Sequence, residues 1–498
     1  MINYLKRSNL IYLVPVFSVL IVYGLTLNPY GIGITPDSVA YLELAQNISH
    51  GEGYVLHGKF VTHWPPFYPF IIGIIDKITK IDILNIAKYL NLTLLFTIAI
   101  TTLKLLKYYK VHFSLKISIP SLILVSTALT VSLYAWSELL FIQLTLLSFL
   151  FSIQGIKNYK SSYLFYGGLI GFLSLLTRYA GIGFIFGQFF IFLIYLPDKN
   201  YLKKIIRILV FSAPIIVGII IWGYVITHMN SHSVDRSITF HPVDSQKILN
   251  ILRTLKIWFF SNPLFVIIPI TVIAALSFYI KVSIKDFLKA LKQVPGSLLI
   301  MIFSYLFFLL VSIHFFDANT PLDNRLLSPI FPFLLIAICK ILDSFRKLNN
   351  RNDINVLLIL TLSSSILSSS FSFYNYHYKN GAGFTSVHNK NIINIIEQAL
   401  TKKDLTIYTN NVSFFEFKFA HSNHIVSSLP NSYNPINHNK NLEFSIQLKK
   451  IKNSISKKNA VIVFFYDMER KYTVSSHLLT KNLEKSAIKH FNWGLIID

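Results

Sequence analysis

The sequence predicts an all-α polytopic membrane protein with about eleven transmembrane helices, followed by a small C-terminal α/β domain. Two observations carry this fold class. The composition is 53% hydrophobic and only 14% charged, and the mean hydropathy is +0.54, which is not typical of a water-soluble chain. The apolar residues are also gathered into runs of about 15–20 residues, each long enough to cross the hydrocarbon core as a helix.

These runs give approximate boundaries for the predicted spans. They lie at 10–27, 84–103, 117–133, 139–155, 162–177, 180–196, 208–226, 263–280, 295–315, 327–342 and 354–371. The first run is expected to remain as an anchor, because the residues that follow it, Asn28-Pro29-Tyr30, offer no small-residue cleavage site. We therefore assign residues 1–372 to a transmembrane domain, with a first outer loop at 28–83, and residues 373–498 to a separate domain.

Lysine and arginine residues fall in alternate loops, which predicts the orientation in the membrane. Short loops rich in these residues tend to stay in the cytoplasm. With eleven spans, the basic clusters share one side: Lys6/Arg7, Lys104/Lys107/Lys110, Lys157/Lys160, Lys199/Lys203/Lys204/Arg207, Lys281/Lys285/Lys289/Lys292 and Arg346/Lys347/Arg351. This pattern predicts a multi-pass plasma-membrane protein with a cytoplasmic N-terminus. The 28–83 loop, the 227–262 loop and the C-terminal domain are then extracytoplasmic.

The formal net charge of +24 is mostly explained by these cytoplasmic loops, so it does not indicate a nucleic-acid partner. Anionic headgroups of the lipid bilayer, or a phosphate-bearing lipid substrate, fit the excess better. The chain has one cysteine, Cys339, so no intrachain disulfide can form.

Residues 373–498 change in character and alternate between two kinds of apolar pattern. The runs predicted as strands are Leu405–Tyr408, Ile425–Ser427 and Ala460–Tyr466, and those predicted as helices are Ile392–Leu400, Phe444–Ile451 and Leu478–Ile488. The alternation predicts a small α/β domain outside the membrane.

The first outer loop begins with a predicted helix that carries a carboxylate. Thr35 is a favourable N-cap, Pro36 fits the first helical position, and the helix is expected to stop near Gly51 and Gly53. Apolar residues line one face, at Tyr41, Leu44, Ala45 and Ile48, which predicts an amphipathic helix along the membrane surface. Asp37 then lies in the first turn, either to accept a proton or bind a metal, or only to complement the helix dipole.

A rigid aromatic segment, His63-Trp64-Pro65-Pro66-Phe67-Tyr68-Pro69, follows in the same loop. Its prolines prevent a regular helix from starting there. The segment either contributes to a site or anchors the loop at headgroup level. A metal site could combine the nearby histidines with Asp37 or Glu52, but the spacing of His50, His57 and His63 matches no standard ligand pattern, which favours surface histidines.

Further polar groups recur at the predicted outer ends of helices. They are Ser137-Glu138, Thr177-Arg178-Tyr179 and Asp323-Asn324-Arg325. Two guanidiniums could clamp phosphate oxygens, and a second carboxylate could help to bind an acceptor or a cation. Taken singly, each group could also be a helix-end ion pair.

The membrane part, roughly 10–345, resembles the GT-C-fold polytopic glycosyltransferases. It is similar to bacterial relatives of protein O-mannosyltransferases and of the aminoarabinose transferases that modify lipid A. The matching motifs are Pro36-Asp37-Ser38 with Tyr41, Pro65-Pro66-Phe67-Tyr68-Pro69, Ser137-Glu138-Leu139-Leu140-Phe141, Leu176-Thr177-Arg178-Tyr179-Ala180-Gly181 and Asn324-Arg325-Leu326-Leu327-Ser328-Pro329. Each is short, but all five occur in order on one consistent topology.

The resemblance implies transfer of a sugar from a polyprenyl-phosphate carrier to an acceptor hydroxyl on the outer face. Asp37 would be the general base or acceptor-orienting acid, and Glu138 a second acidic contact. By the same analogy Arg178 and Arg325 would stabilise the phosphate leaving group. The candidates for further substrate contacts are Tyr41, His63, Trp64, Tyr68 and Tyr179. No cofactor is required, although a divalent metal stays open.

Several alternatives remain at this stage. Asp37 is followed by Ser38, where protein O-mannosyltransferases often have Glu, so the acceptor is open among glycolipid, glycan and protein. A lipid-linked glycan flippase or another transporter also needs many spans and charges, but its charges should lie near the bilayer midplane. A receptor or scaffold would leave the clustered carboxylates and arginines unexplained.

Overall fold

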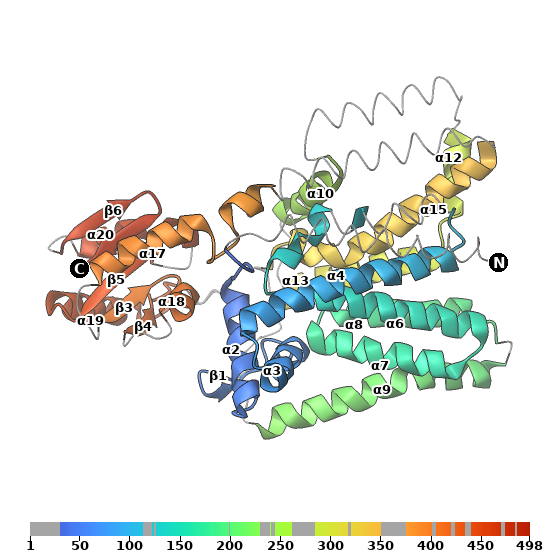
Figure 1. Ribbon diagram of the computed structural model, residues 1–498, viewed down its shortest axis with the longest axis horizontal. Coiled ribbons are helices and arrows are strands. Elements are labelled where there is room, and N and C mark those ends of the chain that lie inside the picture. Colours follow the sequence, from blue (N-terminus) through green and yellow to red (C-terminus); the bar gives the residue numbers. More distant parts are fainter. Residues whose placement is uncertain are drawn as a thin grey trace.

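The membrane domain is a bundle of long helices that run side by side, and the C-terminal domain lies beyond one end of it (Figure 1). The computed structural model describes residues 30–112, 122–123, 126–198, 200–229, 240, 245–260, 284–316, 320–349, 375–400, 405–419, 424–433, 440–469, 474–483 and 486–498. The long helices are α4 (Ile83–Tyr108), α6 (Glu138–Asn158), α7 (Ser161–Thr177), α8 (Gly181–Tyr195), α9 (Tyr201–His228), α13 (Gly296–Phe315) and α15 (Phe331–Asn349). The shorter ones are α10 (Ser245–Phe260), α12 (Ile284–Lys292) and α14 (Asn324–Leu327).

Within the described residues, five helices are long and apolar enough to cross a membrane, and α7 and α8 are shorter apolar helices. These seven coincide with predicted spans; in the last, α14 and a short turn lead into α15. The spans predicted at 10–27, 263–280 and 354–371 lie outside the described residues. The structure is therefore that of a multi-pass membrane protein.

The span predicted at 117–133 differs from the structure. Its described end is a 3₁₀ helix, η1 (Thr127–Leu133). Side chains of other segments hold its carbonyl groups: Asn324 Nδ2 donates to Thr127 O at 3.0 Å, and Asn91 Nδ2 donates to Ser132 O at 2.8 Å. These outside donors satisfy carbonyls that an α-helix would use internally, so the tighter turn is held by its neighbours.

Helix α6 lies in the interior of the bundle, where small and polar residues permit close packing. Gly167 of α7 faces Ser152 of α6: a Cβ built on the glycine would lie 2.8 Å from Ser152 Oγ. The same Ser152 Oγ donates to Gln188 Oε1 of α8 at 2.5 Å. In lipid, close approach and interhelical hydrogen bonds of this kind replace the hydrophobic effect as the force that joins helices. They fix the position of α6 against α7 and α8.

The segment predicted as the first outer loop folds as two packed helices joined by a short hairpin. Its elements are α2 (Pro36–His50), β1 (Val55–Leu56), β2 (Lys59–Phe60) and α3 (Phe67–Thr79). As predicted, α2 starts after Thr35 and ends at Gly51, whose φ is +86°. It does not present an apolar face outward, because α3 covers that face. A Cβ on Gly73 of α3 would lie only 2.5 Å from the backbone oxygen of Ala45, so the two helices touch along their backbones.

The C-terminal domain is built on a five-stranded sheet of order β4-β3-β5-β7-β6. Its strands are β3 (Thr406–Thr409), β4 (Ile425–Ser428), β5 (Ala460–Phe465), β6 (Ile488–Phe491) and β7 (Gly494–Ile497), and its helices are α17 (Val387–Ala399), α18 (Val412–Lys418), α19 (Phe444–Ser456) and α20 (Ser476–Asn482). The first three strands are parallel, and β7 and β6 are antiparallel to their neighbours. This confirms the small α/β domain; its proposed boundary at 372/373 lies outside the described residues.

The sheet is buried on both faces, which makes the domain a three-layer sandwich. Along β5, Val461 and Val463 belong to a core shared with α17 and α18, which is continuous with the core of the membrane domain. Ile462 and Phe464 belong to a second core under α19 and α20. The alternation follows from the two-residue period of a strand. Helices α17 and α18 therefore join this domain to the rest of the protein.

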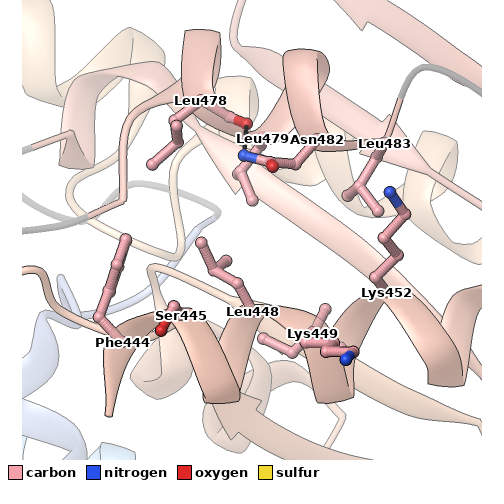
Figure 2. Close-up of a pocket in the computed structure, with 10 residues that line it drawn as sticks. Phe444, Ser445, Leu448, Lys449, Lys452, Leu478, Leu479, Asn482 and Leu483 are labelled. Atoms are coloured by element: carbon pink, nitrogen blue, oxygen red, sulfur yellow. Dashed lines mark hydrogen bonds between the residues drawn. The ribbon is translucent and has the colours of Figure 1, made fainter. Parts of the chain in front are cut away.

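A groove of about 340 Å³ separates α19 from α20 on the other layer. Figure 2 shows Phe444 and Leu448 of α19 facing Leu478 of α20 across it. Lys449 and Lys452 also line the groove. None of the predicted site residues does.

The predicted elements at the end of this domain differ from the structure. Helix α20 stops at Asn482, and Ile488, which was placed in a helix, begins β6. The hairpin β6–β7 and the seven-residue helix α18 were missed. The two hairpin strands have four residues each, too few to show a period clearly.

Candidate active site

Four charged side chains that are distant in the sequence meet at one end of the bundle. Asp37 lies in the first turn of α2, and Glu138 is the first residue of α6. Arg178 is the C-cap of α7, and Arg325 lies in α14. The bundle brings these helix ends together, so the site is assembled from four separate segments.

Glu138 is the buried centre of this cluster. Its Oε1 accepts hydrogen bonds from Arg178 Nη1 and from Arg325 Nε. The Glu138 side chain is 0% exposed, whereas the Arg178 and Arg325 side chains are 16% and 23% exposed. A buried carboxylate is costly unless cations pair with it. The two arginines thus neutralise Glu138, and Glu138 in turn fixes both guanidiniums from behind.

Asp37 is the more accessible carboxylate, with 33% of its side chain exposed. Its Oδ2 accepts from Arg325 Nη1 at 2.5 Å, and its Oδ1 accepts from Trp64 Nε1 at 3.3 Å. Burial by itself raises the pKa of Asp37, but the charge of Arg325 and the hydrogen bonds from Arg325 and Trp64 outweigh it and hold the pKa below its ordinary value. Asp37 is therefore ionised at neutral pH.

Trp136 supports Arg325 from one side. The guanidinium carbon lies 4.4 Å from the centre of the Trp136 ring, which is a cation–π contact. Trp136 Nε1 also donates to Thr35 Oγ1 at 2.7 Å. Thr35 is the N-cap residue of α2, but its side chain makes no capping bond to that helix. One indole therefore joins the start of the Asp37 helix to Arg325.

The backbone of Arg325 is held by its two preceding residues. The Asp323 side chain caps α14 and accepts from Arg325 N at 3.0 Å. Asn324 Oδ1 accepts from Trp258 Nε1 at 2.5 Å, while its Nδ2 donates to Thr127 O and Thr130 Oγ1. The sequence Asp323-Asn324-Arg325 thus works as one unit, in which two residues position the third.

Two of the predicted tyrosines, Tyr41 and Tyr68, are buried behind the charged cluster. Tyr41 OH lies 3.1 Å from Ser137 Oγ, next to Glu138, and is buried. Tyr68 is 0% exposed and packs edge-on against Tyr41, with ring centres 5.2 Å apart. Its hydroxyl has no hydrogen-bond partner within the described part of the chain. Tyr68 therefore forms part of the wall behind Tyr41.

The proline segment stands beside Asp37 and is held in place from two sides. Tyr179 OH donates to Thr62 O at 2.9 Å, and Tyr54 OH donates to Trp64 O at 2.6 Å. The exposed His63 ring lies edge-on to Trp64, with ring centres 4.6 Å apart. The segment is irregular up to Pro66, as predicted, but α3 begins at Phe67, inside the segment. The helix can start there because Pro69 lies in its first turn, where a backbone N–H has no partner within the helix.

Among the described residues, no group of three histidine, cysteine, aspartate or glutamate side chains is arranged to hold a metal ion. The carboxylates Asp37 and Glu138 face guanidiniums instead. His57 contacts carboxylates, with Nδ1 3.3 Å from Glu43 Oε1 and Nε2 3.4 Å from Glu416 Oε1 of α18. The hydrogen bond to Glu43 raises the pKa of His57, against the effect of burial. His57 thus contributes to the contact between the outer loop and the C-terminal domain.

The sequence does not predict that Trp136 bonds to Thr35, or that Asn324 positions Arg325. The only available signal was adjacency, because Trp136 directly precedes the Ser137-Glu138 motif and Asn324 precedes Arg325. Nothing in the spacing indicates that an indole from before α6 reaches α2 and α14.

Fold and site together define a multi-pass membrane protein with two carboxylates and two guanidiniums clustered at one end of its helices. Among the solved structures to which the chain is similar are an oligosaccharyltransferase and an arabinofuranosyltransferase. The chain is similar to ArnT from Cupriavidus metallidurans in the apo state, with a TM-score of 0.56, 11% identity and coverage of 99% of this chain and 98% of that one. ArnT bound to undecaprenyl phosphate gives a TM-score of 0.55 at 11% identity, covering 97% of each chain.

Two more distant likenesses cover most of this chain. The oligosaccharyltransferase AglB from Archaeoglobus fulgidus, in complex with an inhibitory peptide and a dolichol-phosphate, gives a TM-score of 0.51 at 12% identity, covering 93% of this chain and 70% of that one. The arabinofuranosyltransferase AftD from Mycobacteria gives 0.52 at 13% identity, covering 97% and 37%. These likenesses confirm the predicted GT-C fold. No family model matches the sequence, and no curated protein does.

Proposed function

We propose that the protein is a membrane glycosyltransferase that moves a sugar from a polyprenyl-phosphate donor to an acceptor hydroxyl on the outer face of the plasma membrane. The observation that carries this proposal is the contact of Asp37 with Arg325, which Arg178 and Glu138 extend into one cluster at the ends of membrane helices. The cluster pairs a base with cations that suit a phosphate leaving group. Two solved neighbours of this fold hold lipid phosphates, undecaprenyl phosphate and a dolichol-phosphate, which supports a donor of this class.

In the proposed reaction, the acceptor hydroxyl oxygen attacks the anomeric carbon of the donor sugar. The bond between that carbon and the phosphate oxygen breaks, and polyprenyl phosphate leaves with the electron pair. Asp37 accepts the proton of the hydroxyl, which makes the oxygen a better nucleophile at the moment of attack. The exposed third of its side chain gives an acceptor access to the carboxylate.

The arginines stabilise the charge that develops on the phosphate. Both are fixed by Glu138, so they need no reorganisation when the leaving group gains charge. Without a donor, Arg325 is shared between Glu138 and Asp37. When a phosphate engages Arg325, it competes with Asp37 for the same guanidinium, and Asp37 becomes a stronger base. Donor binding would thereby activate the base.

The lipid part of the donor has a suitable surface next to the cluster. An apolar groove of about 700 Å³ lies between α8 and α13, lined by Gly183, Phe186 and Phe190 on α8 and by Phe303 and Phe307 on α13. Helix α8 begins three residues after Arg178. An isoprenoid chain in this groove would therefore have its phosphate near Arg178. This placement supports a lipid-linked donor over a nucleotide sugar.

The transporter alternative expects charges in the middle of the bilayer. Here the four charged residues lie at the first or last turns of their helices or next to them. They also neutralise one another in a compact cluster. The arrangement favours chemistry at one interface.

The test is sugar transfer by the purified wild-type chain in proteoliposomes, with radiolabelled polyprenyl-phosphate sugars as donors and extracted envelope glycolipids, glycans and proteins as acceptors. Two controls are required: the same sugar 1-phosphate without the isoprenoid chain, and the variant Arg178→Ala. We expect transfer only from the lipid-linked donor, and a loss in Arg178→Ala. If carrier lipid crosses the bilayer and no sugar is transferred, the proposed transferase activity is wrong and the protein is a transporter.

A further inference from the structure

The segment that leads into the Asp37 helix is clamped between two other parts of the chain. Gly33 forms a parallel β-bridge with Tyr134, just before α6, and Ile34 forms one with Gly383, from the start of the C-terminal domain. Residues 33–34 are thus the middle strand of a small three-stranded arrangement. Asp37 follows three residues later, in the first turn of α2.

Backbone hydrogen bonds fix this arrangement on both sides. Gly33 N donates to Leu133 O at 2.8 Å, and Ala135 N donates back to Gly33 O at 3.0 Å. On the other side, Phe384 N donates to Ile34 O at 2.7 Å. Both edges of residues 33–34 are therefore paired, and the carbonyl oxygens of Gly33 and Ile34 both accept a backbone hydrogen bond.

The C-terminal side approaches too closely to admit any residue but glycine. Gly383 has a φ of +56°, and a Cβ built on it would lie 2.1 Å from Ile34 O. Gly33 is equally enclosed, since its Cβ would lie 2.8 Å from Cβ of Ala382. Such contacts require a fixed separation of the two segments.

The 382–386 segment is itself held firmly by the C-terminal domain. Phe384 packs edge-on against Phe414 of α18, with ring centres 5.4 Å apart. Asn389 Nδ2 of α17 donates to Gly383 O at 2.8 Å. Thr385 Oγ1 donates across to Ile32 O at 3.1 Å. The soluble domain therefore reaches the strand before Asp37 through side chains as well as backbone.

From these contacts we infer that the 382–386 segment of the C-terminal domain is a positioning element for the active site. It holds residues 32–34 so that Asp37 meets Arg325. This inference rests on the proposed glycosyl transfer for its catalytic consequence, but the positioning itself is a structural statement. It gives the C-terminal domain a role besides acceptor selection.

The segment that pairs with residues 33–34 on the other side leads to a second part of the site. Ala135, which donates to Gly33 O, directly precedes Trp136, the residue that lies under Arg325 and donates to Thr35. A displacement of residues 33–34 would therefore change the position of Asp37 relative to Arg325. It would leave the contact between Glu138 and Arg178 intact. The consequence should be a slower chemical step with nearly unchanged donor binding.

The test compares three full-length variants of the purified protein: Gly383→Ala, Asn389→Ala and Thr385→Val. Gly53→Ala is the matched control for Gly383→Ala, because Gly53 also has a positive φ, +90°, but no heavy atom within 4 Å of its Cβ position. The first readout is amide hydrogen exchange in peptides that cover residues 30–42, which needs no substrate. The second is kcat and KM for the lipid-linked donor, with the acidic limb of the pH profile.

We expect faster exchange at residues 33–37 in all three variants and a loss of kcat of tenfold or more in Gly383→Ala, with donor KM within about twofold of wild type. The acidic limb should move to higher pH, because Asp37 loses part of its contact with Arg325. Should Gly383→Ala fail to fold, the two side-chain variants carry the test. Unchanged exchange and kcat in them would overturn the inference. Changed exchange in a protein without transferase activity would retain the positioning and reject only the proposed function.

Discussion

The substitution Asp37→Asn separates the chemistry of the site from its architecture. Asparagine keeps the size of the side chain, and its one amide oxygen can still accept from Arg325 in place of Oδ2, but the amide nitrogen cannot accept from Trp64. It also cannot take a proton from an acceptor hydroxyl. Arg325 also keeps its contact with Glu138. We therefore expect a folded protein that binds the donor as well as wild type, or slightly better, and transfers sugar slowly.

The magnitude follows from the two roles of Asp37. Loss of a positioned general base lowers kcat by about 10²- to 10⁴-fold, which corresponds to about 3–5 kcal/mol of transition-state stabilisation. The effect on folding should be far smaller. One third of the Asp37 side chain is exposed, and a partly solvated ion pair contributes no more than about 1 kcal/mol. A large loss of rate with a small loss of stability is the expected signature.

The assay is single-turnover transfer from a radiolabelled polyprenyl-phosphate sugar, combined with thermal unfolding in detergent. Glu52→Gln is the matched control, since Glu52 is an exposed carboxylate of the same outer loop. For the wild type, kcat/KM for the donor should be nearly constant from about pH 8 down to about pH 5, because the pKa of Asp37 in the donor-free protein lies below its ordinary value and the carboxylate stays ionised there. This kcat/KM should fall only as the pH drops through that lowered pKa.

Transfer by Asp37→Asn at the rate of Glu52→Gln, with equal donor binding, would refute the role of Asp37 as a base. Glu138 would not be an adequate substitute, because it is fully buried behind the arginines. The proton would then have to leave to water or to the donor phosphate.

Three further outcomes follow from the structure. Glu138→Gln leaves two facing guanidiniums without their buried carboxylate, so we expect a loss of about 3 kcal/mol in the free energy of unfolding, measured by denaturant titration. Protonated His57 contacts Glu43 and Glu416, and its pKa is raised in the folded protein. The stability from this contact is therefore complete at a pH below the ordinary pKa of histidine and is lost as the pH rises through the raised pKa. Proteolysis at α18 should increase from about pH 6 to about pH 8, and His57→Gln should remove that pH dependence. Gly73→Ala should destabilise the outer loop by about 1–3 kcal/mol through overpacking against α2, measured by thermal unfolding.

Control variants accompany the two predictions on unfolding. Asp76→Asn removes a carboxylate of α3 that contacts neither arginine of the cluster and should leave unfolding nearly unchanged. Gly223→Ala inserts a methyl group into α9 where no heavy atom lies within 4 Å, and it should not destabilise. A pH-independent proteolysis pattern in the wild type would contradict the role assigned to His57.

Much of the architecture is determined locally by the sequence. Apolar length alone predicts the long helices, because lipid leaves a backbone no partner except itself. Pro36 and Gly51 determine where α2 begins and ends, for reasons confined to those residues, because proline fits the first helical turn and glycine adopts the positive φ after the last one. Thr35 lies at the N-cap, but its hydroxyl accepts from Trp136 instead of capping the helix. The alternating runs after residue 405 similarly predict three strands of the C-terminal domain. The 3₁₀ turn at Thr127–Leu133 was not predictable, because donors from elsewhere hold its carbonyls.

The site shows the same division. The sequence by itself determined which charged residues stand at helix ends, and their order on one side of the membrane. Only the tertiary structure decided that Glu138 lies behind both arginines, that Asp37 shares Arg325 with it, and that Trp136 lies beneath. It also decided that Gly383, some 350 residues from Asp37 in the chain, borders the strand before it. Spacing along a chain encodes helix ends, whereas contacts between segments depend on how side chains of several helices pack together at once.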